Sequence, residues 1–179
     1  MNDDAPLPER RTARVVLLDP EGRVLLMQGR LPSNPRGPAA WFTVGGGMEP
    51  GESVEEAAAR EVLEETGFAD VRLGPVVWYS ETVLRDPDQR PWHFKENYLV
   101  AWCAGGEPSR EGWTPLEAEL VVGLRWWTVQ ELEVTGEAVF PTGLAQLLAD
   151  VIAGRFSPEP LVIRTLEGPI VPPPRPEGR

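Results

Sequence analysis

The sequence is poor in residues that carry redox and nucleophilic chemistry. Its single cysteine, Cys103, excludes an internal disulfide and favours a buried, inert thiol in a reducing compartment, the cytoplasm. Its single histidine, His93, lies in WHFKENYL, where a structural or surface role outweighs a catalytic one. No apolar run approaches the roughly 20 residues of a membrane span, and MNDDAPLPERR at the N-terminus lacks the apolar segment of a signal peptide. We therefore expect a cytoplasmic protein that does not enter a membrane.

Positive charge is also scarce. Lys and Arg number 17 against 28 Asp and Glu, which gives a formal net charge of −11 at pH 7 and a pI near 4.6. A field of this sign repels nucleic acid polymers and anionic membranes. An anionic substrate would therefore need a cation held locally at its binding site.

The length of 179 residues suits one domain with tails. We expect a flexible N-terminal tail at residues 1–10 and a folded domain at residues 11–157. Residues 158–179 form a C-terminal extension that is rich in proline and is expected to be largely disordered, although EPLVIRTL within it could add a strand.

Apolar runs bounded by turn residues predict a domain rich in strands. The expected strands cover residues 11–18, 23–30, 41–44, 71–84, 92–104 and 120–127, and DPEG joins the first two as a hairpin. GGGMEPGE and GGEPSREGWTPLEAE are expected to be loops. Thr128 and Glu131 predict a short capped helix, and PTGLAQLLADVIAG predicts a core helix that starts at Pro141 and stops at Gly154. Because helices and strands do not alternate strictly, the predicted fold class is α+β with a mixed sheet.

Another helix is predicted to begin after Ser53, which forms a capping box with Glu56, and to stop at Gly67. Its C-terminal end holds three glutamates within one arc of about 100°, bordering the apolar face: Glu61, Glu64 and Glu65. The helix macrodipole opposes anions at this end, and like charges three or four residues apart cost about 0.2–0.5 kcal/mol per pair.

Two interpretations compete for these glutamates. A solvated acidic face is the usual meaning of a charge run, and it suits Glu52, Glu55 and Glu56, where the dipole favours anions. At the other end of the helix a divalent cation explains the charges better. Mg²⁺ binds carboxylate oxygens and commonly shares its coordination shell with substrate phosphates. It would also supply the local positive charge that the composition lacks, so we favour a metal site.

The glutamates belong to a longer spaced pattern. Gly46, Glu52, Arg60-Glu61-Val62, Glu64-Glu65 and Gly67 stand at the spacing of the Nudix box, so this stretch resembles that of the Nudix hydrolases. Two positions differ conservatively from the usual pattern. Phe68 stands where the family usually has an aliphatic residue, and Val44 stands where many members have proline. A weaker resemblance runs from about Arg11 to Gly154.

The resemblance implies a Nudix fold, in which a mixed sheet lies between helices. It also implies a hydrolase that uses Mg²⁺ or Mn²⁺ to cleave the diphosphate linkage of a nucleoside diphosphate joined to another moiety. By position, Glu61, Glu64 and Glu65 are the expected metal ligands, and Arg60 and Glu52 are the buried pair that orients them. Gly46 and Gly47 are expected to let the backbone approach a phosphate or to adopt a positive φ. The expected partner is a small nucleotide or diphosphate, and a homodimer is left open.

The general base is not identified by the pattern. Glu64 and Glu65 are available within the box, and Glu117 and Glu119 in PLEAEL are downstream candidates, of which Glu119 is preferred. A non-hydrolytic binding or regulatory module is the alternative function, but such members tend to lose the carboxylates that are complete in this chain. An isomerase would need cysteine and acid signatures that Cys103 does not supply. No signature identifies the substrate.

Overall fold

The predicted hairpin opens the fold in the computed structural model, which describes residues 6–30, 36–85 and 90–164. Strand β1 (Glu9–Leu18) turns into β2 (Val24–Gly29), with Leu18 paired to Val24. Asp19 holds the turn because its Oδ1 accepts the backbone N–H groups of Glu21 and Arg23. The strand starts at Glu9, two residues before the predicted domain start.

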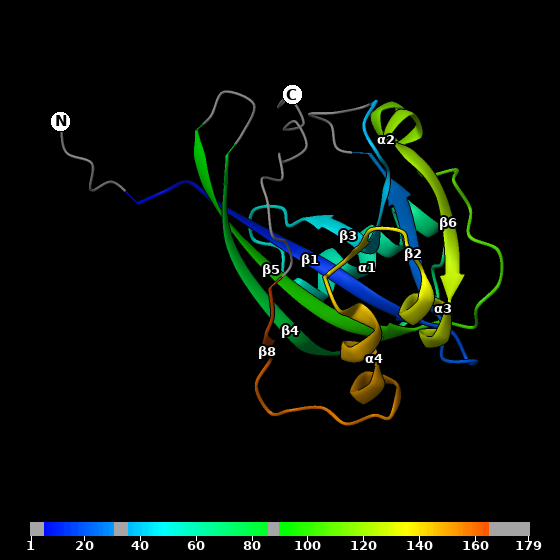
Figure 1. Ribbon diagram of the computed structural model, residues 1–179. Coiled ribbons are helices and arrows are strands. Elements are labelled where there is room, and N and C mark those ends of the chain that lie inside the picture. Colours follow the sequence, from blue (N-terminus) through cyan, green and yellow to red (C-terminus); the bar gives the residue numbers. More distant parts are fainter. Residues whose placement is uncertain (1–5, 31–35, 86–89, 165–179) are drawn as a thin grey trace.

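One eight-stranded sheet organises these parts of the chain (Figure 1), in the order β6-β2-β3-β1-β5-β4-β8 with β7 beside β3. Beyond β1 and β2, the strands are β3 (Ala40–Gly47), β4 (Arg72–Arg85), β5 (Pro91–Trp102), β6 (Val121–Trp127), β7 (Val139–Phe140) and β8 (Leu161–Val162). The β1–β5, β3–β7 and β4–β8 pairs are parallel, and the other pairs are antiparallel. The predicted mixed sheet is therefore confirmed.

Helices cover the two faces of the sheet. They are α1 (Val54–Thr66), α2 (Pro115–Leu120), α3 (Val129–Val134) and α4 (Leu144–Ile152). In Figure 1, α1 lies behind the sheet and α3 and α4 lie in front of it. Each layer has its own core: Ala57, Ala58 and Val62 of α1 pack on one face, and Leu132, Leu144 and Leu148 of α3 and α4 pack on the other. Apolar burial on both faces thus fixes α1 against the centre of the sheet.

The glycine-rich stretch was predicted wrongly as a loop from its first residue. Strand β3 continues through Gly45, Gly46 and Gly47, which pair with Arg14, Ala13 and Thr12 of β1. Glycine weakens a strand in isolation, but here the pairing with β1 keeps all three residues within β3. The site therefore begins on the rigid sheet, and the loop starts only at Met48.

Three other predictions need correction or qualification. Residues 115–119 were expected to be the end of a loop and Leu120 the first residue of a strand, but all six form α2, a short helix that packs beside β6. The core helix starts at Leu144 and not at Pro141, since Gly143 adopts φ 77° and serves as its N-cap. In the predicted C-terminal extension, Leu161 and Val162 pair with Trp78 and Tyr79 of β4 as strand β8. Of the segment that joins β4 to β5, residues 86–89 lie outside the described part of the chain.

The capped short helix at Thr128 is confirmed, with Glu131 completing the capping box. Within residues 6–30, 36–85 and 90–164, no helix is long and apolar enough to cross a membrane.

Candidate active site

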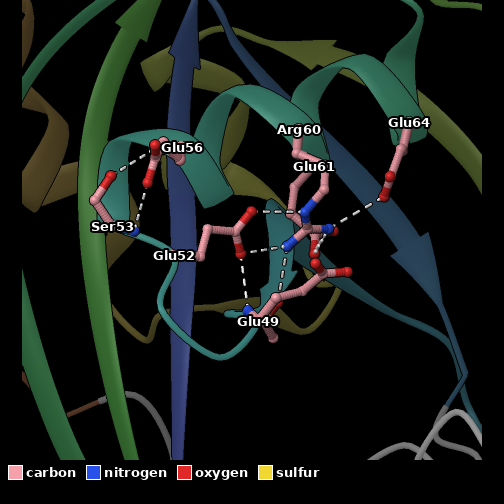
Figure 2. Close-up of polar contacts among 8 residues, drawn as sticks. Glu49, Glu52, Ser53, Glu56, Arg60, Glu61 and Glu64 are labelled. Carbon is pink, nitrogen blue, oxygen red and sulfur yellow. Dashed lines mark hydrogen bonds and ion pairs between the residues drawn. The ribbon is translucent and has the colours of Figure 1, made fainter. Parts of the chain in front are cut away.

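Helix α1 carries the glutamates, and the predicted residues fix both of its ends. Ser53 Oγ accepts the backbone N–H of Glu56, and the Glu56 carboxylate accepts the N–H of Ser53 (Figure 2), so the capping box is confirmed. Gly67 ends the helix in the left-handed conformation at φ 75°, and its N–H donates to Leu63. With both ends satisfied, the helix holds its glutamates in one register over the sheet.

Burial separates the three glutamates into two kinds. Glu61 and Glu65 are buried, with 8% and 5% of their surface exposed, on the face that packs against the sheet. The side chain of Glu64 is 52% exposed, contrary to the expectation that all three border the buried face. Because the helix turns about 100° per residue, Glu64 falls on the side of Glu61 that is away from Glu65.

Arg60 is the centre of the polar network (Figure 2). Its Nε and Nη2 donate to the two carboxylate oxygens of Glu52, at 2.8 and 2.9 Å. Its Nη1 donates to Glu61 at 2.8 Å and to Glu64 at 3.2 Å. Nη2 also donates to the carbonyl of Gly47 at 3.0 Å. The predicted contact of Arg60 with Glu52 is thus present, and the same guanidinium joins α1 to the end of β3.

This network shifts the protonation of its carboxylates in opposite directions. The hydrogen bonds from Arg60 lower the pKa of Glu52 from its ordinary 4.5 to about 2. Desolvation raises the pKa of Glu61 above its ordinary value, and the hydrogen bond from Arg60 offsets only part of that. Burial therefore disfavours the charged form of Glu61, and a bound cation would oppose that effect.

One of the two roles predicted for Gly46 and Gly47 is wrong. Neither Gly46 nor Gly47 adopts a positive φ, which corrects that part of the prediction; the positive φ of 123° belongs to Gly45. A Cβ on Gly45 would lie 2.2 Å from the carbonyl oxygen of Ala13 on β1. A Cβ on Gly46 would lie 2.7 and 2.8 Å from the two carboxylate oxygens of Glu61. Only glycine fits at either position without a shift of its neighbours.

A backbone group of the sheet orients the Glu65 side chain. Its Oε2 accepts the backbone N–H of Gly45 at 2.7 Å. The end of the helix behind it is satisfied by the segment between β5 and α2: Trp113 Nε1 donates to the carbonyl of Glu65, and the N–H of Ser109 donates to that of Thr66, each at 2.8 Å. These donors reduce the negative potential at the C-terminal end of α1, where the glutamates gather.

The downstream acids are less closely tied to the box. Trp113 brings the chain against the end of α1, and α2 begins two residues later. Glu119 is exposed on α2, and its side chain lies outside the Arg60 network as the described residues form it. The side chain of Glu117 lies outside the described part of the chain. The structure therefore brings together Arg60, Glu61, Glu64 and Glu65 with Gly46 and Gly47, but it does not join Glu119 to them.

The donor set suits a hard divalent cation. The ligand atoms offered by Glu61, Glu64 and Glu65 are all carboxylate oxygens, the kind that Mg²⁺ and Mn²⁺ prefer. In the part of the chain that the structure describes, no group of three or more acidic, histidine or cysteine side chains is arranged to hold a metal ion. Arg60 binds oxygens of both Glu61 and Glu64. A cation would therefore have to compete with Arg60 Nη1 for them, while the bare Cα of Gly46 leaves the Glu61 oxygens clear of any side chain from that position.

Sequence reasoning missed one arginine next to the site. Arg14 of β1 donates to the carbonyl of Gly45 at 2.8 Å and pairs with Glu96 of β5 at 3.2 Å. Burial opposes its charge, but the carboxylates of Glu96 and Glu65 outweigh that effect and raise the pKa of the guanidinium. A charged residue in the apolar run TARVVLL, at a position between two buried neighbours, is the signal that could have pointed to it.

The sequence and the fold are similar to those of several known proteins. The NUDIX domain model matches residues 8–150. An RNA pyrophosphohydrolase from Caulobacter vibrioides is 31% identical over 139 residues, which cover 74% of this chain and 77% of that protein. A putative 8-oxo-dGTP diphosphatase from Bacillus subtilis is 41% identical over 86 residues, 48% of each chain. A crystal structure of a MutT protein from Methanosarcina mazei has the same fold, with a TM-score of 0.56 at 16% identity over 84% of this chain and 97% of that chain.

Proposed function

The chain belongs to the NUDIX family, and we propose that it is a Mg²⁺-dependent pyrophosphohydrolase that cleaves the diphosphate linkage of a small nucleotide. The predicted membership of the Nudix hydrolases and the predicted Nudix fold are confirmed. The metal, the residues that hold it, the base and the size of the substrate are the parts that we propose.

One observation carries the proposal: the charge at the C-terminal end of α1 is larger than the protein itself compensates. Arg60 is shared among Glu52, Glu61 and Glu64, and desolvation still raises the pKa of Glu61. A helix end that opposes anions, with two buried glutamates and a third beside them, costs folding stability. A metal site for phosphate chemistry explains why the protein keeps this destabilising arrangement, whereas a solvated acidic face does not explain it.

Glu61, Glu64 and Glu65 would hold the metal. When bound, Mg²⁺ supplies polarisation of the phosphoryl oxygens and a lowered pKa of bound water. The residues of the chain do the positioning: Gly45 N–H orients Glu65, and Arg60 orients Glu61 while anchoring Gly47. Phosphoryl transfer requires chiefly this kind of positioning and charge neutralisation.

A carboxylate then accepts a proton from the attacking water. Glu119 remains our first candidate, because it is exposed on α2 and the segment before α2 packs on the end of α1. Glu64 is the alternative, since it is the exposed glutamate of the box and has a single hydrogen bond, to Arg60, among the described contacts. A base of either kind typically contributes about 10²–10⁴-fold in rate.

The substrate is proposed to be a small nucleotide and not an RNA end. One relative is an RNA pyrophosphohydrolase and another is a putative 8-oxo-dGTP diphosphatase, so both sizes of substrate occur among similar proteins. The formal net charge of −11 disfavours the phosphate contacts along a polymer that give RNA-binding proteins most of their affinity. A mononucleotide needs charge compensation only at its diphosphate, where the metal would supply it.

We also propose that the protein is cytoplasmic, because nucleotides are available there and a free cysteine stays reduced.

The non-hydrolytic alternative is disfavoured because all three glutamates and the Arg60–Glu52 pair are in place. Whether the protein is a monomer or a homodimer is answered by its mass in solution by light scattering.

A substrate panel tests the proposal. Nucleoside triphosphates, nucleoside diphosphate sugars, dinucleoside polyphosphates and a 5′-triphosphorylated RNA are incubated with the protein in Mg²⁺ and in EDTA. We expect Mg²⁺-dependent release of phosphate-containing product from at least one mononucleotide class, with slower turnover of the RNA. Turnover of the RNA alone would contradict the proposed substrate size, and turnover of none in any metal would support a binding module.

A further inference from the structure

Arg14 lies on the face of the sheet opposite α1, directly behind the glutamates. Its neighbours in β1 alternate between the two cores: Ala13 and Val15 pack with α1, whereas Val16 packs with α3 and α4. Strand alternation therefore puts the Arg14 side chain on the side of Val16. Gly45 of β3 and Tyr98 of β5 are its partners in the sheet.

The Arg14 guanidinium is fixed at two points. Its Nη1 donates to the carbonyl of Gly45 at 2.8 Å, and its Nε donates to Glu96 Oε1 at 3.2 Å. Glu96 is itself buried and immobilised, because its Oε2 accepts the hydroxyls of Ser80 and Tyr98 at 3.2 and 3.3 Å. Arg14 thus connects a rigid polar group on β4 and β5 to the last residues of β3.

Gly45 passes that constraint to the other face of the sheet. Its carbonyl is bound by Arg14, while its N–H donates to Glu65 Oε2 at 2.7 Å. Its Cα lies so close to β1 that a Cβ would be 2.2 Å from the oxygen of Ala13. Gly45 is therefore bound by Arg14 of β1 and by Glu65 of α1, at a position that admits no side chain.

A parallel exists on the α1 side. Arg60 Nη2 binds the carbonyl of Gly47 at 3.0 Å, just as Arg14 Nη1 binds that of Gly45. The two arginines bind the carbonyls that precede and follow Gly46, and Gly46 lies against the Glu61 carboxylate. Arg60 contacts Glu61 and Glu64 directly, whereas Glu65 is oriented by Gly45.

We propose that Arg14, anchored by Glu96, is a positioning residue for Glu65 that acts through Gly45 and sets how tightly the three glutamates bind a divalent cation. The inference rests on the proposed function, because it assumes that Glu65 is a metal ligand. Groups that orient metal ligands without touching the metal typically contribute 10–100-fold to metal affinity. Since Arg14 acts through one further residue, we expect an effect of about tenfold, at the lower end of that range.

Binding of Mn²⁺ alone, followed by electron paramagnetic resonance in the absence of substrate, tests this proposal. Arg14→Met removes the guanidinium and its positive charge near Glu65. Loss of the charge alone would strengthen cation binding, so the weakening of Mn²⁺ binding by about tenfold that we expect reports lost positioning. Arg14→Lys carries a single ammonium that cannot bridge Gly45 and Glu96 in the same way, so it should fall between wild type and Arg14→Met. Glu96→Gln keeps Arg14 but loosens its anchor, and serves as the milder variant if Arg14→Met does not fold.

Arg23→Met is the matched control. Arg23 also pairs with a buried carboxylate, Asp19, but at the hairpin turn instead of the glycine stretch. Its loss should lower the melting temperature and leave Mn²⁺ affinity unchanged. If Arg14 had a merely structural role, Arg14→Met and Arg14→Lys would behave like this control, with a lower melting temperature and unchanged Mn²⁺ affinity.

The outcomes separate the two proposals. Wild-type protein that binds no Mn²⁺ would overturn the proposed function and this inference together. Wild-type binding with equal affinity in Arg14→Met would overturn the inference alone. Activity provides a second readout: saturating Mg²⁺ should restore much of the Arg14→Met rate. A raised KM that excess metal does not correct would mean that Arg14 contacts substrate, and would also overturn the positioning role.

Discussion

Arg60 forms a bidentate ion pair with Glu52: its Nε donates to Oε1 at 2.8 Å, and its Nη2 donates to Oε2 at 2.9 Å. The paired geometry joins residues eight positions apart, one before α1 and one in its middle. Glu52 Oε2 also accepts the backbone N–H of Glu49 at 2.8 Å, so the loop that follows β3 is folded against the same guanidinium. The loop and the helix are therefore joined through one guanidinium.

Arg60→Ala is expected to lose activity and roughly 1.5–3 kcal/mol of the free energy of unfolding, the usual contribution of a hydrogen bond to a charged group. The side chain of Glu52 is 12% exposed and would be left without its partner. Arg155→Ala is the control, because its pair with Asp150 is about two-thirds exposed and such pairs contribute little. Urea denaturation measures both; equal stability of the two variants would show that Arg60 is merely a solvated residue.

Acid should remove the Arg60 contribution in a defined window. Glu52 has a lowered pKa of about 2 in the folded protein and an ordinary value of 4.5. A lowered pKa means that the stabilisation is fully present above about 4.5 and is lost as pH falls toward about 2. The stability difference between wild type and Arg60→Ala should therefore shrink across this range. A difference that stays constant from pH 6 to pH 2.5 would contradict the pairing with an ionised Glu52.

Gly46→Ala should damage the metal site more than the fold. Gly46 has no positive φ, so the backbone accepts alanine, but the new Cβ would lie 2.7 Å from Glu61 Oε1 and would displace that carboxylate. We expect clearly weaker Mg²⁺ binding by titration calorimetry, with a small change in melting temperature. Gly51→Ala should do the reverse: its φ of 85° strains alanine, while no atom lies within 4 Å of the new Cβ. Unchanged metal affinity in Gly46→Ala would place Glu61 outside the site.

Glu119→Gln tests the downstream base. If Glu119 accepts the proton, the rate should fall by about 10²–10⁴-fold while metal affinity stays near that of wild type. Added Mg²⁺ should not rescue the rate, although higher pH should recover some of it because hydroxide replaces the missing base. A near-normal rate would move the base to Glu64 or Glu65 within the box.

The parts of the site that follow from local chemistry could be predicted. Ser53, Glu56 and Gly67 define α1 through contacts within a few residues, and those contacts are present. The Arg60–Glu52 pair was implied by the resemblance to the Nudix box and not by helical spacing, and it is present. The solvent exposure of Glu64 was harder to predict. An arc of about 100° on a helix includes both the border of the buried face and the adjoining solvent side.

What could not be predicted depends on distant packing. Three consecutive glycines are equivalent locally, and only the approach of Ala13 on β1 selects Gly45 for the positive φ. The Arg14–Glu96 pair joins residues 82 positions apart, which no periodicity reveals. Helix α2 has six residues, and here a local signal was passed over: Thr114 and Glu117 stand at the same capping-box spacing as Ser53 and Glu56, with Pro115 at the first helical position.

The account rests centrally on a metal held by the glutamates of α1, and Mg²⁺ titration of nucleotide hydrolysis by Glu64→Gln tests it most directly. Glu55→Gln, an exposed glutamate in the first turn of the same helix, is the control. We predict that Glu64→Gln needs more Mg²⁺ for half-maximal rate than wild type and regains part of the lost rate at high Mg²⁺, while Glu55→Gln matches wild type. Identical Mg²⁺ dependence of all three proteins, or hydrolysis that persists in EDTA, would contradict the account.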